Sequence, residues 1–253
     1  MKKLADLDII IPVYNEAENI SPVLDALCRD VHTPFRVLIC YDFDEDNTLE
    51  VISAYPKDKV EIILVKNPGT GPHNAMREGI AKSTATYVLT HMADDDYTTS
   101  HIDFMVEKAK EGYLIVTGSR FMKGGSMIGC PWFKKFLTWF ASFTLYHFAR
   151  FPVHDATHGV RVFSRKVIDS IEVESRKGFS YSFELMVKVH RLGWNVYEFP
   201  VVWQERQAGT SRFQIRKWFF PYMRWYIYAF ATTWLKKDPS SALRKNSTAL
   251  DDA

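Results

Sequence analysis

Three consecutive carboxylates, Asp94, Asp95 and Asp96, follow the apolar residues 87–89. Acidic side chains after a buried strand often hold a divalent ion, because Mg²⁺ and Mn²⁺ prefer carboxylate oxygens. In an extended chain, residues two apart point to the same side, so Asp94 and Asp96 can share a ligand set. Asp95 points the other way and is expected to accept hydrogen bonds from backbone amides where the next helix begins. The cluster predicts a metal site on Asp94, with Asp96 as second ligand.

Polar clusters also follow three other apolar runs in the first half of the chain. They occupy residues 12–16, 42–48 and 118–120. Ligands of mostly parallel sheets bind beyond the carboxyl ends of the strands. A single polar cluster would only mark the end of a strand, but four on the same predicted edge favour a binding site.

The elements that would position these clusters alternate between strands and helices. Short apolar runs predict strands, and apolar residues at intervals of three and four predict helices. The predicted strands cover residues 8–12, 36–41, 60–65, 86–90 and 114–117, and the predicted helices cover residues 16–30, 71–83 and 101–111. This alternation predicts an α/β fold with a Rossmann-like, mostly parallel sheet flanked by helices.

Composition and short motifs narrow the class of protein. The 253 residues carry a formal net charge of +2, which gives no reason to expect nucleic-acid binding. Neither G-x-G-x-x-G nor G-x-x-x-x-G-K-[ST] occurs, which disfavours a dinucleotide dehydrogenase and a P-loop enzyme. The three cysteines are too scattered for a zinc or redox motif, so a reducing compartment is expected. The N-terminus lacks the features of a signal peptide.

Aromatic residues make up 15 % of the chain and crowd into residues 132–151 and 213–234. Both segments predict helices that are apolar around much of their circumference and framed by Lys and Arg. Such helices typically lie in a membrane interface, although buried core helices are the alternative. Pro221 is expected to kink the second helix. No uncharged run reaches the roughly 20 residues that a membrane span needs.

Eight stretches, taken in order, match one known family. They are IIPVYNE (10–16), the acidic turn at 42–48, NAMREGIAKSTATYVLT (74–90), the Asp cluster, GSRF (118–121), DATHGVRVFSRKVI (155–168), GFSYSFELMVKVHRLGWNVYEFPV (178–201) and RQAGTSRF (206–213). Together they resemble family-2 glycosyltransferases of the GT-A fold, and among these the polyprenyl- and dolichyl-phosphate mannosyltransferases.

The resemblance implies an inverting transferase with a GDP- or UDP-sugar donor and Mg²⁺ or Mn²⁺ as cofactor. It implies one GT-A catalytic domain over residues 1–237, with candidate interface helices at 132–151 and 215–237. The polar residues 238–253 are expected to form a disordered tail. Matched by position, the nucleotide-sugar contacts would be Pro12, Tyr14, Glu16, Asp42, Asp44, Asp94, Arg120, Arg206, Ser211 and Arg212.

Two motifs depart from the family pattern. A turn that usually reads D-D-G-S is here residues 42–45, D-F-D-E, which leaves open which acid contacts the nucleoside and whether the base is guanine or uracil. The D-A-D motif after the fourth strand is here Met92-Ala93-Asp94 or, in another register, Asp94-Asp95-Asp96. Met92 is a poor ligand for a hard cation, and Asp94 is common to both registers.

The acceptor implied by the resemblance is a polyprenyl phosphate at the cytoplasmic face of a membrane. With a second pKa of about 6, such a phosphate is largely a dianion at neutral pH and needs no general base. It needs cations that hold it in line, and arginine suits this by its bidentate geometry. Arg161 and Arg212 are the expected acceptor contacts. The expected catalytic set is Asp94, Arg120, Asp155, Arg206 and Arg212.

Two alternatives stay open. A glycan hydroxyl acceptor, as in lipopolysaccharide or exopolysaccharide synthesis, requires a general base, and Asp155 is the candidate. Asp155 is equally compatible with organising its loop or assisting the metal. The other alternative is a non-catalytic nucleotide-sugar-binding homologue, which is motivated by Met92 and the altered acidic turn.

Overall fold

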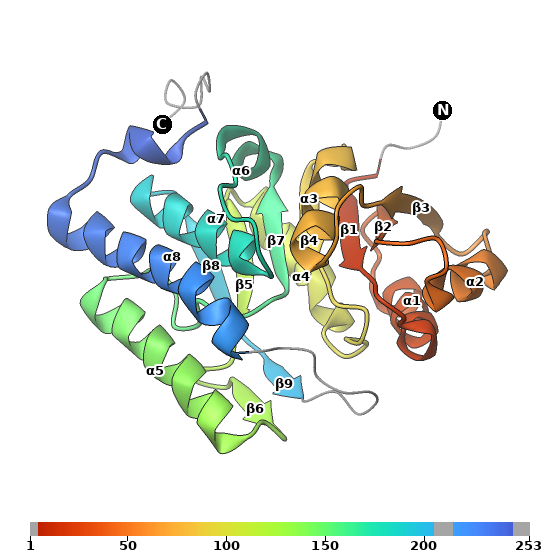
Figure 1. Cartoon of the computed structure of the whole chain (residues 1–253), viewed down its shortest axis with the longest axis horizontal. Helices are drawn as coiled ribbons and strands as arrows, with labels where there is room; N and C mark the ends of the chain where they lie inside the picture. The colour runs from red at the N-terminus through yellow and green to blue at the C-terminus, as the bar shows by residue number, and fades with distance from the viewer. Residues whose placement is uncertain (1–4, 205–214, 245–253) are drawn as a thin grey trace. The chain divides into compact units, whose positions relative to one another are not determined.

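The computed structural model describes residues 5–204 and 215–244 (Figure 1). The chain divides into two compact units. Unit 1 comprises residues 1–111 and 159–165, and unit 2 comprises residues 112–158 and 166–253. The single catalytic domain expected over residues 1–237 stays a prediction.

The described residues of unit 1 form five strands in the order β3-β2-β1-β4-β7 (Figure 1). Neighbouring strands are parallel except for β7, which runs antiparallel to β4. Helix α3 packs against β1, β2 and β3. The elements of unit 1 are β1 (Leu7–Pro12), α1 (Ala17–Asp30), β2 (Phe35–Tyr41), α2 (Asn47–Ala54), β3 (Glu61–Lys66), α3 (Pro72–Lys82), β4 (Tyr87–Thr90), η1 (Thr99–His101), α4 (Ile102–Lys110) and β7 (Arg161–Ser164).

Strand β1 lies at the centre of this sheet and is buried on both faces, which explains its continuous run of apolar residues. Asp8 is the polar exception, with 0 % of its surface exposed. Its carboxylate accepts hydrogen bonds from the Arg36 guanidinium at 2.9 Å and from the Ser83 hydroxyl at 2.8 Å. A buried carboxylate is tolerated when it is paired in this way, and Asp8 thereby ties β1 to β2 and to the end of α3.

Helix α2 was not predicted from the sequence. Asp46 caps it, because the Asp46 carboxylate accepts the backbone N–H of Thr48 at 2.9 Å. The acidic turn at 42–48 therefore contains a helix start signal as well as candidate ligand residues.

In the described part of unit 2, β5 pairs with β8 and β6 pairs with β9, both in parallel. Its elements are β5 (Ile115–Ser119), β6 (Ser126–Ile128), α5 (Trp132–Phe148), α6 (Arg165–Ser170), α7 (Ser180–Arg191), β8 (Val196–Pro200), β9 (Val202–Gln204), α8 (Ile215–Leu235) and η2 (Pro239–Ala242). The mostly parallel α/β sheet flanked by helices is thus confirmed.

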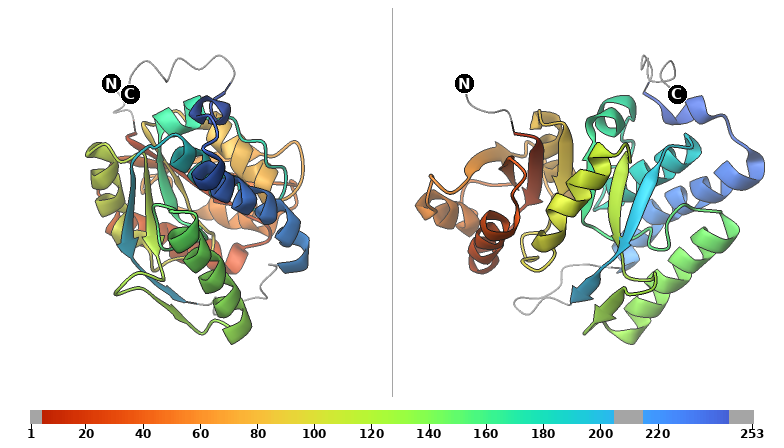
Figure 2. Two further views of the ribbon diagram at one scale, coloured as in Figure 1. Left: turned by 90° about the vertical axis from the view of Figure 1, so that its left-hand side faces the viewer. Right: turned by 180° about the vertical axis from the view of Figure 1, so that it is seen from behind.

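Helix α8 continues through Pro221 to Leu235, so Pro221 does not end it. Helix α7 packs along α8, and the Trp225 indole, 1 % exposed, donates to the Ser175 hydroxyl at 2.8 Å. Helix α5 also lies against α8 (Figure 2), where the hydroxyls of Thr144 and Tyr226 are 2.7 Å apart.

The tail expected to be disordered from residue 238 begins with an ordered turn, so that expectation is wrong for residues 238–244. Asp238 caps η2 through the backbone N–H of Ser240, and Ala242 is buried. The backbone N–H of Arg244 donates to the carbonyl of Ser170 at 2.7 Å. These local and tertiary hydrogen bonds outweigh the polar composition. Residues 245–253 lie outside the described part.

Candidate functional site

In unit 1 the loop after β1 presents Tyr14, whose side chain is 48 % exposed. Its ring meets that of Phe43, in the loop after β2, edge to face with 5.4 Å between centroids. Two aromatic rings at the carboxyl ends of neighbouring parallel strands form a surface on which a nucleotide base or ribose can pack. The sequence predicts Tyr14, and half-buried Pro12 beside it, but misses Phe43 because it stands where the resembled family carries an acid.

The loop that carries Tyr14 and Glu16 is fastened to the start of α2. The Asp46 carboxylate accepts the backbone N–H of Asn15, with 3.1 Å to each oxygen. The Thr48 hydroxyl accepts the backbone N–H of Glu16 at 2.9 Å. Asp46 is 2 % exposed, so it anchors this loop and caps α2 at once. Sequence reasoning did not assign Asp46 this role.

Asp42 and Asp44, both predicted nucleotide contacts, differ in their surroundings. Asp42 accepts from the Asn67 amide and from the backbone N–H of Gly71, each at 2.7 Å. Gly71 precedes α3 with a φ of 86°, in the left-handed region that favours glycine. Asp44 is exposed and forms a surface ion pair with Lys66. Asp42 therefore orients the start of α3, and Asp44 is the acid more open to a ligand.

The three consecutive aspartates take three different positions after β4. Asp95 is 6 % exposed, and its carboxylate accepts the backbone N–H of Thr98 at 3.0 Å and the Thr98 hydroxyl at 2.7 Å. This is the helix-start role expected for Asp95. Asp94 is half-buried and Asp96 is exposed. Strand β4 ends at Thr90 and residues 93–94 form a turn, so the alternation of an extended chain does not apply here.

The residues present fit a divalent ion bound together with substrate. Within residues 5–204 and 215–244, no group of three His, Cys, Asp or Glu side chains is placed to hold a metal. Mg²⁺, however, is usually held by one or two carboxylates plus substrate phosphates and water. Asp94, half-buried after β4, can supply such a carboxylate. The turn at residues 93–94 removes the reason for expecting Asp96 on the same side, and both ligand roles stay predictions.

Arg161, a predicted acceptor contact, lies on β7 opposite Thr90 and is 1 % exposed. A guanidinium buried to this extent belongs to the interior of unit 1. It offers an acceptor phosphate almost no surface, and its predicted role stays a prediction.

In unit 2 the residue after β5, Arg120, forms a bidentate ion pair with Asp155. Arg120 Nε lies 2.6 Å from Asp155 Oδ2, and its Nη2 lies 2.9 Å from Oδ1. Asp155 also accepts the backbone N–H and the hydroxyl of Thr157, each at 3.0 Å. The Asp155 side chain is 0 % exposed and that of Arg120 is 8 % exposed. The pair is therefore a buried, geometrically fixed unit.

The surroundings of Asp155 argue against a general base. Burial alone would raise its pKa, but the charge and hydrogen bonds of Arg120 outweigh burial and hold the pKa well below its usual range. The charge of the neighbouring His158 acts in the same direction. An efficient base has a pKa near the working pH and reaches the proton that it removes. Asp155 is instead placed to orient Arg120.

Residues 205–214 lie outside the described part, and the predictions for Arg206, Ser211 and Arg212 fall there. Sequence reasoning also missed Thr157 and Glu198 as partners of the Arg120–Asp155 pair. Thr157 carried a local signal, because a hydroxyl two residues after an Asp commonly closes a turn. Glu198 lies 43 residues from Asp155 and carried no such signal.

Solved structures share this fold. Glucosyl-3-phosphoglycerate synthase of Mycobacterium tuberculosis, solved with Mn²⁺, UDP and glucosyl-3-phosphoglycerate, superposes with a TM-score of 0.65 at 15 % identity, covering 91 % of this chain and 80 % of that one. The same enzyme with Mg²⁺ and UDP gives a TM-score of 0.63 at 16 % identity, covering 93 % and 81 %. At these identities the likeness shows the GT-A fold alone.

Sequence relatives cover most of the chain as well. Polyprenol monophosphomannose synthase of Mycolicibacterium smegmatis is 26 % identical over 236 residues, 87 % of this chain and 86 % of its own. Dolichyl-phosphate hexose transferase of Haloferax volcanii is 25 % identical over 212 residues, 81 % and 86 %. The profile of glycosyl transferase family 2 matches residues 8–172, more than half of the chain. The chain therefore belongs to glycosyl transferase family 2 and is a glycosyltransferase.

Proposed function

We propose that this enzyme transfers a hexose from a nucleotide sugar to a polyprenyl phosphate at a membrane surface. The observation that carries the proposal is an exposed aromatic face on α5. The names of the two sequence relatives contain polyprenol monophosphomannose and dolichyl phosphate, which supports the same assignment.

The aromatic face consists of seven side chains that are 38–79 % exposed. They are Trp132, Phe133, Phe136, Trp139, Phe140, Phe143 and Phe148. Soluble monomeric proteins rarely expose so many large apolar side chains on one face, and such patches mark contact with a membrane or a partner. Lys134 and Lys135 lie on the same helix, and a Trp-rich amphipathic helix with cations is typical of the lipid interface. No described helix is long and apolar enough to cross a bilayer, so contact along the surface is the mode proposed.

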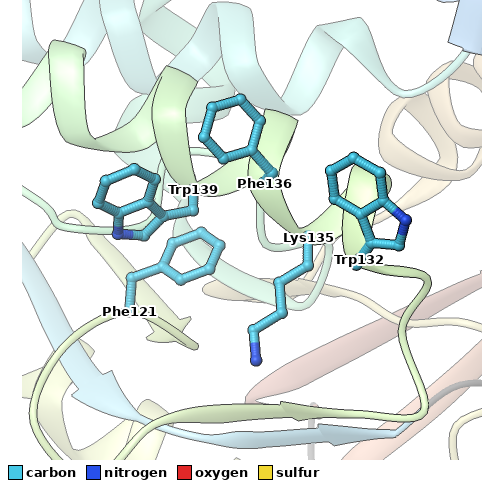
Figure 3. A pocket seen from close by; sticks show the side chains of 5 residues that line it. All are labelled: Phe121, Trp132, Lys135, Phe136 and Trp139. Atoms are coloured by element: carbon cyan, nitrogen blue, oxygen red, sulfur yellow. The ribbon is translucent and has the colours of Figure 1, made fainter.

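A pocket of about 280 Å³ lies between the first half of α5 and Phe121 (Figure 3). Four aromatic rings line it, from Phe121, Trp132, Phe136 and Trp139, together with Lys135. In Figure 3 the Lys135 side chain runs between Phe121 and Trp132, with its amine pointing away from α5. An apolar chain matches the four rings of this lining, and the Lys135 amine lies beside it. The pocket supports an isoprenoid phosphate as the acceptor.

The proposed reaction joins a phosphate oxygen of the acceptor to the anomeric carbon of the donor sugar. The bond from that carbon to the nucleoside diphosphate breaks, and the diphosphate leaves with the electron pair. A dianionic phosphate attacks without losing a proton, so the step needs no base. The buried, ion-paired state of Asp155 accords with this acceptor and weakens the case for a glycan hydroxyl. A divalent ion held by Asp94 and Asp96 would neutralise charge on the departing diphosphate.

A donor screen tests the proposal. The protein is heated with Mn²⁺ and one of GDP-mannose, GDP-glucose, UDP-glucose or UDP-galactose. A ligand that binds only the folded state raises the free energy of unfolding by about 2.7 kcal/mol at 100 times its Kd. We expect one nucleotide to raise Tm, and to do so less when EDTA replaces Mn²⁺. No shift with any donor would contradict the proposal.

Tyr14→Ala is expected to weaken binding of the nucleotide found in that screen. Stacking of a base on an aromatic ring contributes about 1–3 kcal/mol, so Kd should rise about 5- to 150-fold. Phe43→Ala, which removes the ring beside Tyr14, should weaken binding in the same direction. Leu64→Ala, at a side chain 50 % exposed on β3, serves as control and should leave Kd unchanged. Calorimetry measures all three. If Tyr14→Ala bound the nucleotide with the Kd of wild type, the aromatic surface of Tyr14 and Phe43 would not be part of the donor site.

Replacing Phe133 and Phe140 together by Ser is expected to release the protein from lipid. Burying each ring contributes about 1.5–3 kcal/mol, so partitioning should fall at least about tenfold. Wild type should bind vesicles of phosphatidylcholine with phosphatidylglycerol more tightly than pure phosphatidylcholine, because each lysine near an anionic surface adds about 1 kcal/mol. Leu64→Ser is the control. Sedimentation with vesicles measures partitioning, and equal binding of the double variant and wild type would refute docking through α5.

A further inference from the structure

Glu198 lies on β8 beside Thr117 of β5, and its side chain is 9 % exposed. A carboxylate in so little water is costly unless its oxygens accept hydrogen bonds. Both oxygens do so. Oε1 accepts the backbone N–H of Asp155 at 2.9 Å, and Oε2 lies 2.8 Å from Nδ1 of His154. Because a carboxylate only accepts, Nδ1 carries the proton. Glu198 therefore fixes two successive residues of one loop.

The second of these residues is the one that holds Arg120. Asp155 accepts from Nε and Nη2 of Arg120 and from its backbone N–H, the last at 3.1 Å. Nη2 also donates to the hydroxyl of Thr157 at 2.6 Å. The guanidinium fork is planar, so its direction follows the direction of the Asp155 carboxylate. That carboxylate is in turn set by the backbone that Glu198 holds.

The first of these residues connects the loop to α5. The His154 ring stacks on that of Tyr146, with 3.9 Å between centroids and 24° between planes. Tyr146 is half-buried on the helix that carries the aromatic face. The contacts thus run from α5 through Tyr146, His154, Glu198 and Asp155 to Arg120.

We propose that Glu198 is a positioning residue that fixes the orientation of the Arg120 guanidinium through Asp155. His154, whose ring stacks on Tyr146, in turn holds Oε2 of Glu198. Glu198 touches no reacting atom in this account. It keeps the Asp155 carboxylate in place, and Asp155 presents the guanidinium in one orientation. The consequence for turnover rests on the proposed function, because it requires Arg120 to contact donor or acceptor. The consequence for the orientation of Arg120 does not.

The test follows the Nε–H proton of Arg120 by NMR of arginine-labelled protein, with the signal assigned by its loss in Arg120→Lys. Glu198→Met keeps the side-chain length and removes both acceptors. We expect exchange of this proton with water to become about tenfold faster, as loss of a hydrogen-bond anchor allows. Glu198→Gln restores one acceptor and should fall between Glu198→Met and wild type. Glu172→Met, at an exposed acid of unit 2, is the matched control and should behave as wild type.

If Glu198→Met does not fold, Glu198→Gln and His154→Phe decide. His154→Phe keeps a ring against Tyr146 and removes the Nδ1–H donor, so exchange should again be faster than in wild type. Wild-type exchange in folded Glu198→Met, or in both of the other variants, would overturn the proposal.

Turnover gives the second readout, with GDP-mannose or the donor from the screen, and undecaprenyl phosphate in vesicles. In Glu198→Met we expect kcat to fall about 10- to 100-fold, because a misplaced Arg120 guanidinium disturbs the geometry of the reacting groups. KM for the donor should change less than about twofold. A rise in KM with unchanged kcat would contradict a positioning role. If wild type transfers no sugar, the proposed function fails, and the exchange measurement still decides the role of Glu198.

Discussion

Asp94→Ala is expected to lower kcat for sugar transfer at least about 100-fold, whereas Asp95→Ala should keep it within about threefold. Asp94 is the acid common to both possible metal registers and is half-buried after β4. Carboxylates that hold an ion at a departing diphosphate contribute several kcal/mol to stabilising the transition state. The Asp95 oxygens are occupied by Thr98, so its loss should act on stability instead. Each hydrogen bond to Thr98 that is lost costs about 0.5–1.5 kcal/mol.

Two measurements separate these outcomes. Initial rates of transfer are compared with Tm for both variants, and calorimetry records Mn²⁺-dependent binding of the donor nucleotide. Asp94→Ala should lose the Mn²⁺ dependence at a nearly unchanged Tm, and Asp95→Ala should show the reverse. Equal losses of transfer in the two variants would mean that the metal register is wrong.

Asp155→Asn is expected to destabilise the protein by about 3–5 kcal/mol and to suppress transfer, because it leaves the buried Arg120 guanidinium without its counter-charge. Chemical denaturation at pH 7 measures the free energy of unfolding. Glu172→Gln, which neutralises an exposed acid of the same unit, should leave stability within about 0.5 kcal/mol. A free energy of unfolding equal to wild type would contradict the buried-pair account.

The loss of stability in Asp155→Asn is expected to depend on pH. The pKa of Asp155 is depressed in the folded protein by Arg120. Its contribution to stability is therefore fully present above the unfolded pKa of about 3.9 and is lost as the pH falls below it towards the folded value. The stability difference between wild type and Asp155→Asn should be constant from about pH 7 to pH 5 and should shrink below pH 4. If the difference in free energy of unfolding between wild type and Asp155→Asn grew as the pH fell, the ion pair with Arg120 would not be the source of the stability.

Local patterns sufficed for much of the fold. The apolar run at 8–12 predicts a strand that the structure shows as Leu7–Pro12, and the helix expected at 101–111 appears as Ile102–Lys110. Such elements follow from periodicity because their burial is continuous or one-sided. Helix α2 was missed because its N-cap, Asp46, was interpreted only as part of a ligand turn.

The site was less predictable, because its geometry depends on contacts between residues distant in sequence. The motif around Asp155 marks it as important but cannot show that its carboxylate is buried against Arg120, 35 residues earlier. Nothing in the sequence distinguishes Glu198 from other strand residues. Only the structure shows its carboxylate hydrogen-bonded to residues 154 and 155. The structural role of Asp95 could be predicted because its hydrogen bonds go to Thr98, only three residues further on.

Transfer of hexose to a lipid phosphate is measured by following labelled hexose from GDP-mannose, or from the donor found in the screen, into lipid. The enzyme is incubated with Mn²⁺ and undecaprenyl phosphate in vesicles that contain phosphatidylglycerol, and the organic phase is counted. We expect an acid-labile, lipid-linked hexose that requires the lipid phosphate and disappears in Asp94→Ala. Lipid-linked label that does not require the lipid phosphate, or no lipid-linked product with any of the donors, would contradict this activity.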